Sequence, residues 1–148
     1  MSLIAIPAPA DDRISARSRV SERELLRQRS LVDYLRNVVT TGPEDRERFH
    51  AVFLDEVHAI LGDAPLGEGG RGTLSFRMRE VFALALGLGA SGLIVAHNHP
   101  SGQCRPSRCD IDATRRLKGV ANALDIELVD HLIITRSAVY SMRAGGNL

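Results

Sequence analysis

The sequence predicts an α/β domain in which a mixed β-sheet is flanked by helices. Segments with helical periodicity alternate with short apolar segments of strand length, and this interleaving is typical of helices packed on a sheet. The run from Gly92 to Ala96 is apolar throughout and has the length of a buried strand. With 148 residues, 44% of them hydrophobic, the chain can form one domain around one core.

The amino-terminal part of the chain is predicted to form a tail and a helix. Residues 1–20 mix Pro, Ala, Asp, Arg and Ser without periodicity, so we expect a flexible tail. Residues 21–42 contain one amphipathic helix, which a capping box of Ser21 and Glu24 opens and Gly42 ends. Its apolar residues recur at roughly helical intervals: Leu25, Leu26, Leu31, Leu35 and Val39.

Residues 43–148 are predicted to form the main domain. In its first half we expect a buried strand over residues 49–55, a glycine-rich loop over 62–72, a short strand over 72–76 and a helix over 79–88. In its second half we expect a strand over 92–96, a loop over 97–108, a helix over about 110–124, and strands over 126–135 and 138–142.

The composition leaves several classes of protein without support. Lys and Arg number 19 against 18 Asp and Glu, so the chain has no basic surplus for binding the phosphate backbone of nucleic acids. No stretch approaches the ~20 apolar residues that a membrane span needs. The first ten residues carry no basic leader and are interrupted by Pro7 and Pro9, so no signal peptide is expected. Cys104 and Cys109 are expected to be reduced thiols in a soluble, cytoplasmic protein.

The chemically informative segment runs from His97 to Asp110. At the end of an extended strand, His97 and His99 project to the same side because side chains alternate with a period of two. Asp110, on the first turn of the next helix, would supply a third ligand. Two imidazoles and a carboxylate with a fourth position open to water form the pattern of a catalytic zinc site. One zinc ion there would lower the pKa of bound water towards about 7 for hydrolysis.

Each part of this motif also has a simpler interpretation. Ser107-x-x-Asp110 is an ordinary capping box at the start of a helix, although the hydroxyl of Ser107 could also donate to the oxyanion of a tetrahedral intermediate. A His-x-His pair at a strand end is commonly a hydrogen-bonded or exposed pair when nothing else is present. The complete spacing, with Pro100 and Pro106 in the loop between, favours the metal site.

The pattern His97-x-His99-Pro100 followed by Ser107-x-x-Asp110 resembles the JAMM motif of the Jab/MPN metalloproteases. The resemblance to the RadC family is closer and covers roughly residues 47–142. It rests on the runs Ala96-His97-Asn98-His99-Pro100-Ser101-Gly102, Pro106-Ser107-Arg108, Thr114-Arg115-Arg116-Leu117 and Asp130-His131-Leu132-Ile133-Ile134.

The resemblance implies a JAB1/MPN-type, cytidine-deaminase-like fold with zinc held by His97, His99 and Asp110 and with Ser107 assisting. It also implies a general-base glutamate at the start of an earlier strand, for which the sequence offers three candidates: Glu47, Glu56 and Glu80. The family pattern of Glu-x-Phe followed by apolar residues and Leu-Asp is similar to the run from Glu47 to Asp55, and this favours Glu47.

Two functions are therefore expected. The first is a zinc-dependent hydrolase, a metallopeptidase or isopeptidase that cleaves an amide bond in a protein or peptide substrate. The alternative is a RadC-type accessory protein of DNA repair or mobile-element maintenance, whose main role is binding. RadC proteins usually carry a helix-hairpin-helix segment, and the residues before Glu47 lack the glycine hairpin it needs, so DNA binding by that route is doubtful.

Other patterns near the motif are expected to be structural. The run from Gly87 to Gly92 satisfies GxGxxG, but it follows a helix and precedes a strand, the reverse of the dinucleotide-binding order. The two cysteines flank the motif, yet the deaminase signature of a Glu two residues after His and a Cys-x-x-Cys is missing. The remaining histidines are predicted to be structural rather than ligands, although His131 could face the cleft: His50, His58 and His131.

Overall fold

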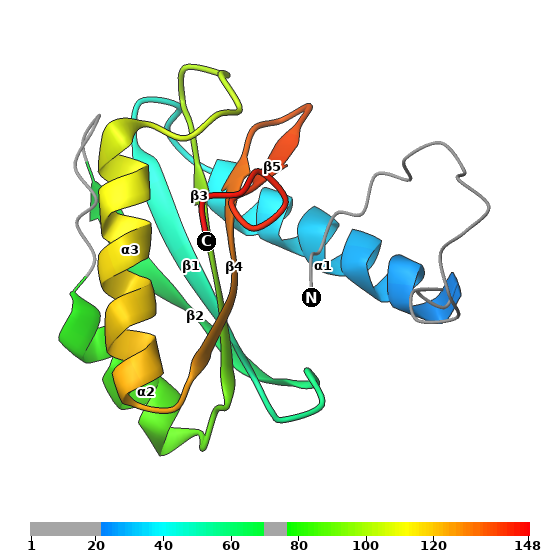
Figure 1. The fold of residues 1–148 in the computed structure, drawn as a ribbon. Helices are drawn as coiled ribbons and strands as arrows, with labels where there is room; N and C mark the ends of the chain where they lie inside the picture. Colours follow the sequence, from blue (N-terminus) through cyan, green and yellow to red (C-terminus); the bar gives the residue numbers. More distant parts are fainter. Residues whose placement is uncertain (1–21, 70–76) are drawn as a thin grey trace, which may run out of the picture.

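The computed structural model describes residues 22–69 and 77–148, which form a five-stranded sheet with three helices. The elements in chain order are α1 (Glu22–Thr40), β1 (Glu47–Leu54), β2 (Ile60–Gly69), α2 (Met78–Gly87), β3 (Gly92–Asn98), α3 (Arg108–Ala123), β4 (Glu127–Ile134) and β5 (Val139–Ser141) (Figure 1). The strand order is β2-β1-β3-β4-β5, in which only the β3–β4 pair is parallel. The predicted mixed sheet flanked by helices is therefore confirmed.

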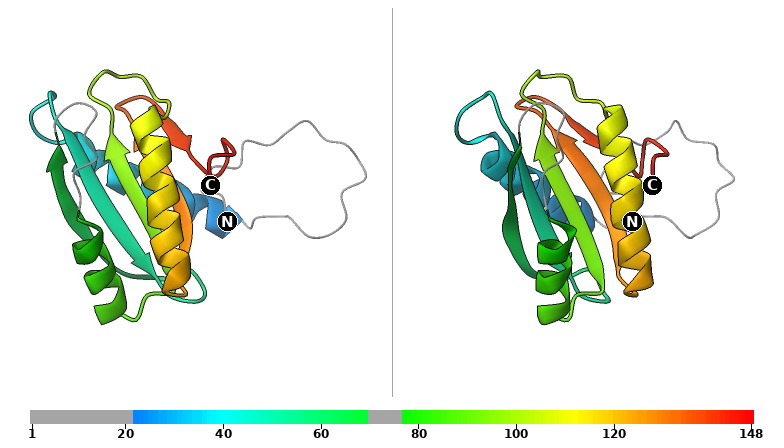
Figure 2. Two further views of the ribbon diagram at one scale, coloured as in Figure 1. Left: turned by 60° about the vertical axis from the view of Figure 1, so that its left-hand side comes forward. Right: turned by 90° about the vertical axis from the view of Figure 1, so that its left-hand side faces the viewer.

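Two apolar clusters lie on the two faces of the sheet. Helices α2 and α3 cover one face, and α1 covers the other (Figure 2). Alternation along β3 divides its side chains between the clusters: Leu93 and Val95 lie under α2 and α3, whereas Ile94 and Ala96 lie under α1. Because β3 is buried on both faces, its residues from Gly92 to Ala96 are all apolar rather than alternating between apolar and polar.

Helix α1 is present where the sequence predicts it, but its buried apolar stripe is shorter than expected. Leu35 and Val39 are buried against the sheet, together with Val32, whereas Leu25 and Leu26 are exposed. The expected cap at Ser21 and the tail over residues 1–20 lie outside the described residues. The contacts of α1 with the sheet therefore lie mainly in its second half.

The prediction of a glycine-rich loop over residues 62–72 is wrong for its first part. Residues 60–69 form strand β2, which pairs antiparallel with β1 along its whole length. An edge strand gains its stability from backbone hydrogen bonds to its one neighbour, so a sequence rich in glycine and polar residues can still form it. The short strand predicted over residues 72–76 lies outside the described residues.

The elements around the motif are confirmed, with changed boundaries. Strand β3 continues to Asn98, so His97 lies within the strand rather than in the loop after it. Helix α3 begins at Arg108, directly after the Ser107 cap. Within the part of the chain that the structure describes, no helix is long and apolar enough to cross a membrane.

Substitution of Leu35 tests the packing of α1 on the sheet. Leu35→Ala should lower the free energy of unfolding by about 2–5 kcal/mol because a fully buried side chain is lost. Leu26→Ala on the same helix is the matched control, and since Leu26 is 56% exposed it should change that free energy by less than about 0.5 kcal/mol. Chemical denaturation followed by circular dichroism measures both. Equal losses would contradict the described packing.

Candidate metal centre

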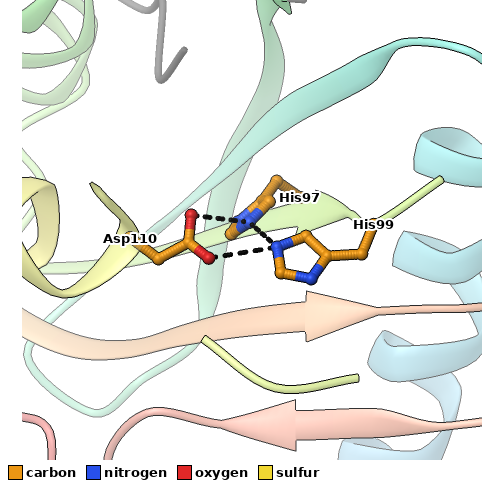
Figure 3. Close-up of side chains that lie close together, drawn as sticks. All are labelled: His97, His99 and Asp110. Atoms are coloured by element: carbon orange, nitrogen blue, oxygen red, sulfur yellow. Dashed lines mark hydrogen bonds and ion pairs between the residues drawn. The ribbon is translucent and has the colours of Figure 1, made fainter. Parts of the chain in front are cut away.

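Three side chains that can bind a metal converge where β3 ends and α3 begins (Figure 3). The Nε2 atoms of His97 and His99 lie 3.0 Å apart. The carboxylate of Asp110 lies against both rings, with Oδ1 3.2 Å from the Nε2 of His97 and Oδ2 3.0 Å from the Nε2 of His99. Ligand atoms about 2.0–2.1 Å from a tetrahedral ion lie roughly 3.3 Å from one another, so these separations suit one ion.

Helix α3 begins in a way that fixes the carboxylate of Asp110. The Oγ of Ser107 accepts a hydrogen bond of 3.1 Å from the amide of Asp110, and the amide of Ser107 donates one of 2.7 Å to Oδ2 of Asp110. This reciprocal pair is the capping box that the sequence predicts. A carboxylate in the first turn of a helix is also favoured by the helix dipole.

The surroundings of Asp110 keep it ionised despite its burial. Burial by itself would raise the pKa of this carboxyl group, but its contacts with His97 and His99, together with the hydrogen bond from the amide of Ser107, hold the pKa far below its usual range. A buried negative charge beside two imidazoles is an environment that attracts a cation. The donor set therefore could hold a metal ion.

The two histidines are held by different contacts. The ring of His97 is fully buried and stacks on Phe49, with ring centroids 5.0 Å apart. Burial lowers the pKa of His97 and so favours the neutral form that a ligand requires. The Nδ1 of His99 lies 2.9 Å from the carbonyl oxygen of Gln103, to which only a protonated nitrogen can donate. This contact leaves the Nε2 of His99 facing Asp110.

The pKa of His99 also reports the negative charge of the site. Burial would lower this pKa, but the hydrogen bond to Asp110, the carbonyl of Gln103 and the charges of Asp110 and Glu47 outweigh burial and raise it. The negative charges that favour a proton on the Nε2 of His99 would also favour a metal ion bound to the same nitrogen. The position of His99 is thus suited to a cation.

Glu47 lines the same cavity as one candidate ligand, His99. It is the first residue of β1 and only 8% exposed. The pairing of β1 with β3 ends with Phe49 opposite His97, and extending this register by two residues would bring Glu47 opposite His99. A cavity of about 280 Å³ is lined by Glu47, His99, Pro100, Ser101, Gln103, Arg105, Pro106 and Ser107. Burial, and to a smaller extent the charge of Asp110, raise the pKa of Glu47.

Asn98 is a residue that the sequence analysis missed. Its Oδ1 accepts a hydrogen bond of 2.6 Å from the amide of Arg48, and its Nδ2 donates one of 3.0 Å to the carbonyl of Arg46. These are the backbone groups on either side of Glu47, so Asn98 extends the pairing of β1 and β3 beyond the last paired residues and fixes Glu47. The sequence signal was a polar side chain between the two histidines, just after the apolar run from Gly92 to Ala96.

His131 contacts the cluster from inside the core without belonging to it. It is not one of the three candidate ligands, but it is fully buried in β4 and its Nε2 lies 2.8 Å from the Nδ1 of His97. Its own Nδ1 lies 2.7 Å from the Oγ1 of Thr114 on α3. The sequence offered Thr114 only as part of a run that resembles the RadC family, with no role of its own. Both residues contact the metal centre from inside the core.

The rival candidates lie elsewhere. Glu56 is exposed in the turn after β1, at the opposite end of that strand from Glu47. Glu80 is exposed on α2 and pairs with Arg77. The Sγ of Cys104 donates to the carbonyl of Ile133, and Cys109 is exposed; among the described residues, neither thiol joins the cluster.

The other patterns have structural roles. His50 pairs with Asp63 of β2 at 2.6 Å, and His58 lies 3.3 Å from Glu127 of β4. The GxGxxG run ends α2 and turns into β3, where Gly89 adopts a φ of 66° that favours glycine. This agrees with its prediction as a helix stop.

Comparison with known proteins identifies close relatives. A family model described as "RadC-like JAB domain" matches residues 25–147. A UPF0758 protein of Ruegeria pomeroyi is 39% identical over 134 residues, which cover 90% of this chain and 59% of the relative. A UPF0758 protein of Burkholderia mallei is 37% identical over 145 residues, covering 97% and 51%. A third, of Flavobacterium johnsoniae, is 40% identical over 100 residues, covering 68% and 44%. The chain thus spans about half the length of the curated relatives it matches.

The cluster predicts specific metal binding. Purified protein should hold close to one divalent ion per chain, and His99→Ala should lose that ion while the fold is kept, because it removes a ligand that lies at the edge of the site with a side chain still 10% exposed. His58→Ala is the matched control, since His58 is bound to Glu127 away from the cluster. Elemental analysis measures the ion in each sample. Full occupancy in a His97→Ala/His99→Ala double variant would contradict the assignment.

Proposed function

The chain belongs to the family of RadC-like JAB domain proteins, and from this membership and the geometry of its site we propose that it is a zinc-dependent hydrolase of the JAMM type. Its reaction would be that of a metallopeptidase or isopeptidase acting on an amide bond in a protein or peptide. The observation that carries the proposal is the position of Glu47, a buried carboxylate in the same cavity as His99 and Ser107.

The donor set supports zinc as the metal. Two imidazole nitrogens and one carboxylate oxygen are a common ligand set of catalytic zinc, which leaves a fourth position for water. Zinc bound by His97, His99 and Asp110 would supply an acidified water and polarise the scissile carbonyl. The protein's contribution is then to hold the ligands, move the proton and stabilise the oxyanion.

Glu47 is proposed to be the general base. A base must be close to the water it deprotonates, and Glu47 lines the cavity beside His99. Its raised pKa makes it a better proton acceptor than an exposed glutamate and lets it return the proton to the departing amine. Asn98 accepts a hydrogen bond from the amide of Arg48 and donates one to the carbonyl of Arg46, and these bonds hold the backbone on both sides of Glu47 in place.

Ser107 is proposed to stabilise the oxyanion. Its Oγ accepts the amide hydrogen of Asp110, and this leaves the hydroxyl hydrogen available as a donor. Ser107 lines the cavity together with Glu47. The capping role and the proposed catalytic role therefore use different parts of the same hydroxyl group.

A binding role as an accessory protein is the weaker proposal. A module that only binds a partner has no use for a buried base beside a set of metal ligands. The net charge of +1 also gives little attraction for DNA.

The proposed hydrolase would work in the cytoplasm, where thiols such as those of Cys104 and Cys109 remain reduced.

Replacement of Glu47 tests the proposed mechanism. Glu47→Gln keeps the shape of the side chain but removes the base, so turnover should fall about 10²–10⁴-fold while zinc content stays that of the wild type. A search for new peptide termini in a proteome treated with wild type or variant supplies the substrate for the assay. Glu80→Gln, exposed on α2, is the matched control and should leave turnover unchanged. Full activity in Glu47→Gln would refute the assignment.

Titration with DNA separates the two functions. Affinity for duplex DNA at physiological salt should be weak, because the chain has no surplus of positive charge. Fluorescence anisotropy over a range of salt concentrations measures it. Sub-micromolar binding that persists as salt is raised would favour the accessory role instead.

A further inference from the structure

A chain of buried hydrogen bonds leads from His97 into the core. The Nδ1 of His97 lies 2.8 Å from the Nε2 of His131, and the Nδ1 of His131 lies 2.7 Å from the Oγ1 of Thr114. The hydroxyl of Thr114 donates a hydrogen bond of 2.6 Å to the backbone carbonyl of Asp110. The side chains of His97, His131, Thr114 and Asp110 are all buried.

These three hydrogen bonds and the close contact between Asp110 and His97 form a closed loop. They start at the carbonyl of Asp110, pass through Thr114 and His131 to His97, and return to Asp110, whose Oδ1 lies 3.2 Å from the Nε2 of His97. Helix α3, strand β4 and strand β3 each contribute to the loop. Two of the three candidate ligands are thus tied together through residues that are not ligands.

The direction of each hydrogen bond follows from the one at Thr114. A carbonyl oxygen only accepts, so the single hydroxyl hydrogen of Thr114 points to Asp110, and towards His131 the Oγ1 atom can only accept. The Nδ1 of His131 therefore carries a hydrogen. The ring of His131 is fully buried, and a charged imidazole costs much free energy away from water, so the ring is neutral and its Nε2 is a bare acceptor.

The same reasoning reaches the metal centre. Because the Nε2 of His131 accepts, the Nδ1 of His97 must donate, and the neutral ring of His97 then has no hydrogen on Nε2. In the opposite arrangement Thr114 would donate to His131 and His131 would donate to His97. The single ring hydrogen of His97 would then lie on Nε2, where it would block a metal. The bond from Thr114 to Asp110 selects between the two arrangements.

We propose that Thr114 and His131 are positioning residues that hold His97 in the tautomer whose Nε2 lone pair faces His99 and Asp110. Outer partners of ligating histidines generally fix the tautomer and the orientation of the ring. Here that partner is itself a histidine, whose own tautomer is set by a threonine. The inference rests on the proposed metal site but not on hydrolysis.

Zinc affinity of Thr114 variants provides the first test. Thr114→Val keeps the shape but removes the acceptor of His131, so the hydrogen of His131 should move to Nε2 and reverse the chain. Zinc affinity, measured by competition with a chromophoric chelator, should fall about 10–100-fold. Thr114→Ser retains the hydroxyl and should bind zinc as the wild type does. Thr135→Val, at another buried threonine whose hydroxyl contacts Ala138, controls for the general cost of losing a hydroxyl.

The tautomers themselves provide the second test. Long-range ¹⁵N–¹H correlation spectra of histidine-labelled protein should show His131 with its hydrogen on Nδ1 in the wild type, with and without zinc, and on Nε2 in Thr114→Val. A purely structural role of Thr114 would lower the melting temperature without changing the tautomer.

The outcomes separate this inference from the proposed function. Wild-type zinc affinity in Thr114→Val, or His131 with its hydrogen on Nε2 in the wild type, would overturn the inference while leaving the zinc site intact. Absence of zinc binding in the wild type would overturn the proposed function, and the wild-type spectrum would still decide the tautomer of His131. If Thr114→Val fails to fold, the wild-type spectrum still tests the inference, because it shows which nitrogen of His131 carries the hydrogen.

Discussion

A carboxylate inside a protein costs free energy unless other groups replace the water it has lost. Asp110 meets this condition through the amide of Ser107, the first turn of α3 and the rings of His97 and His99. Because these groups come from two places in the chain, the end of β3 and the start of α3, their shared contact with one carboxylate brings these two elements together. Glu47 can act as the proposed base only because this carboxylate and the two imidazoles form a metal site beside it.

The sheet supplies the rigid frame for the site. Strand β3 lies between β1 and β4, so His97 has Phe49 on one side and His131 on the other. Helix α1 fills the opposite face through Leu35 and its neighbours, and this keeps β3 buried on both faces. A strand held in this way presents its last side chains in fixed directions, which metal ligands require.

Polar residues behind the site decide how precisely it is built. Asn98 replaces strand pairing beyond the last paired residues and fixes the start of β1, where Glu47 lies. Thr114 and His131 determine which nitrogen of His97 is bare. Each of these buried groups has its hydrogen-bonding partners, as buried polar groups need for stability.

The sequence by itself determined the features that depend on neighbouring residues. Strand periodicity placed His97 and His99 on one side, and the Ser107-x-x-Asp110 cap was confirmed, while Glu47 was chosen only through the family resemblance. Tertiary structure alone decided the rest. Strand β2 is held by its pairing with β1 rather than by the propensity of its own residues, and Asn98 and His131 act through partners 34 to 52 residues away. Local patterns report backbone geometry over a few residues, whereas such contacts exist only once the sheet has formed.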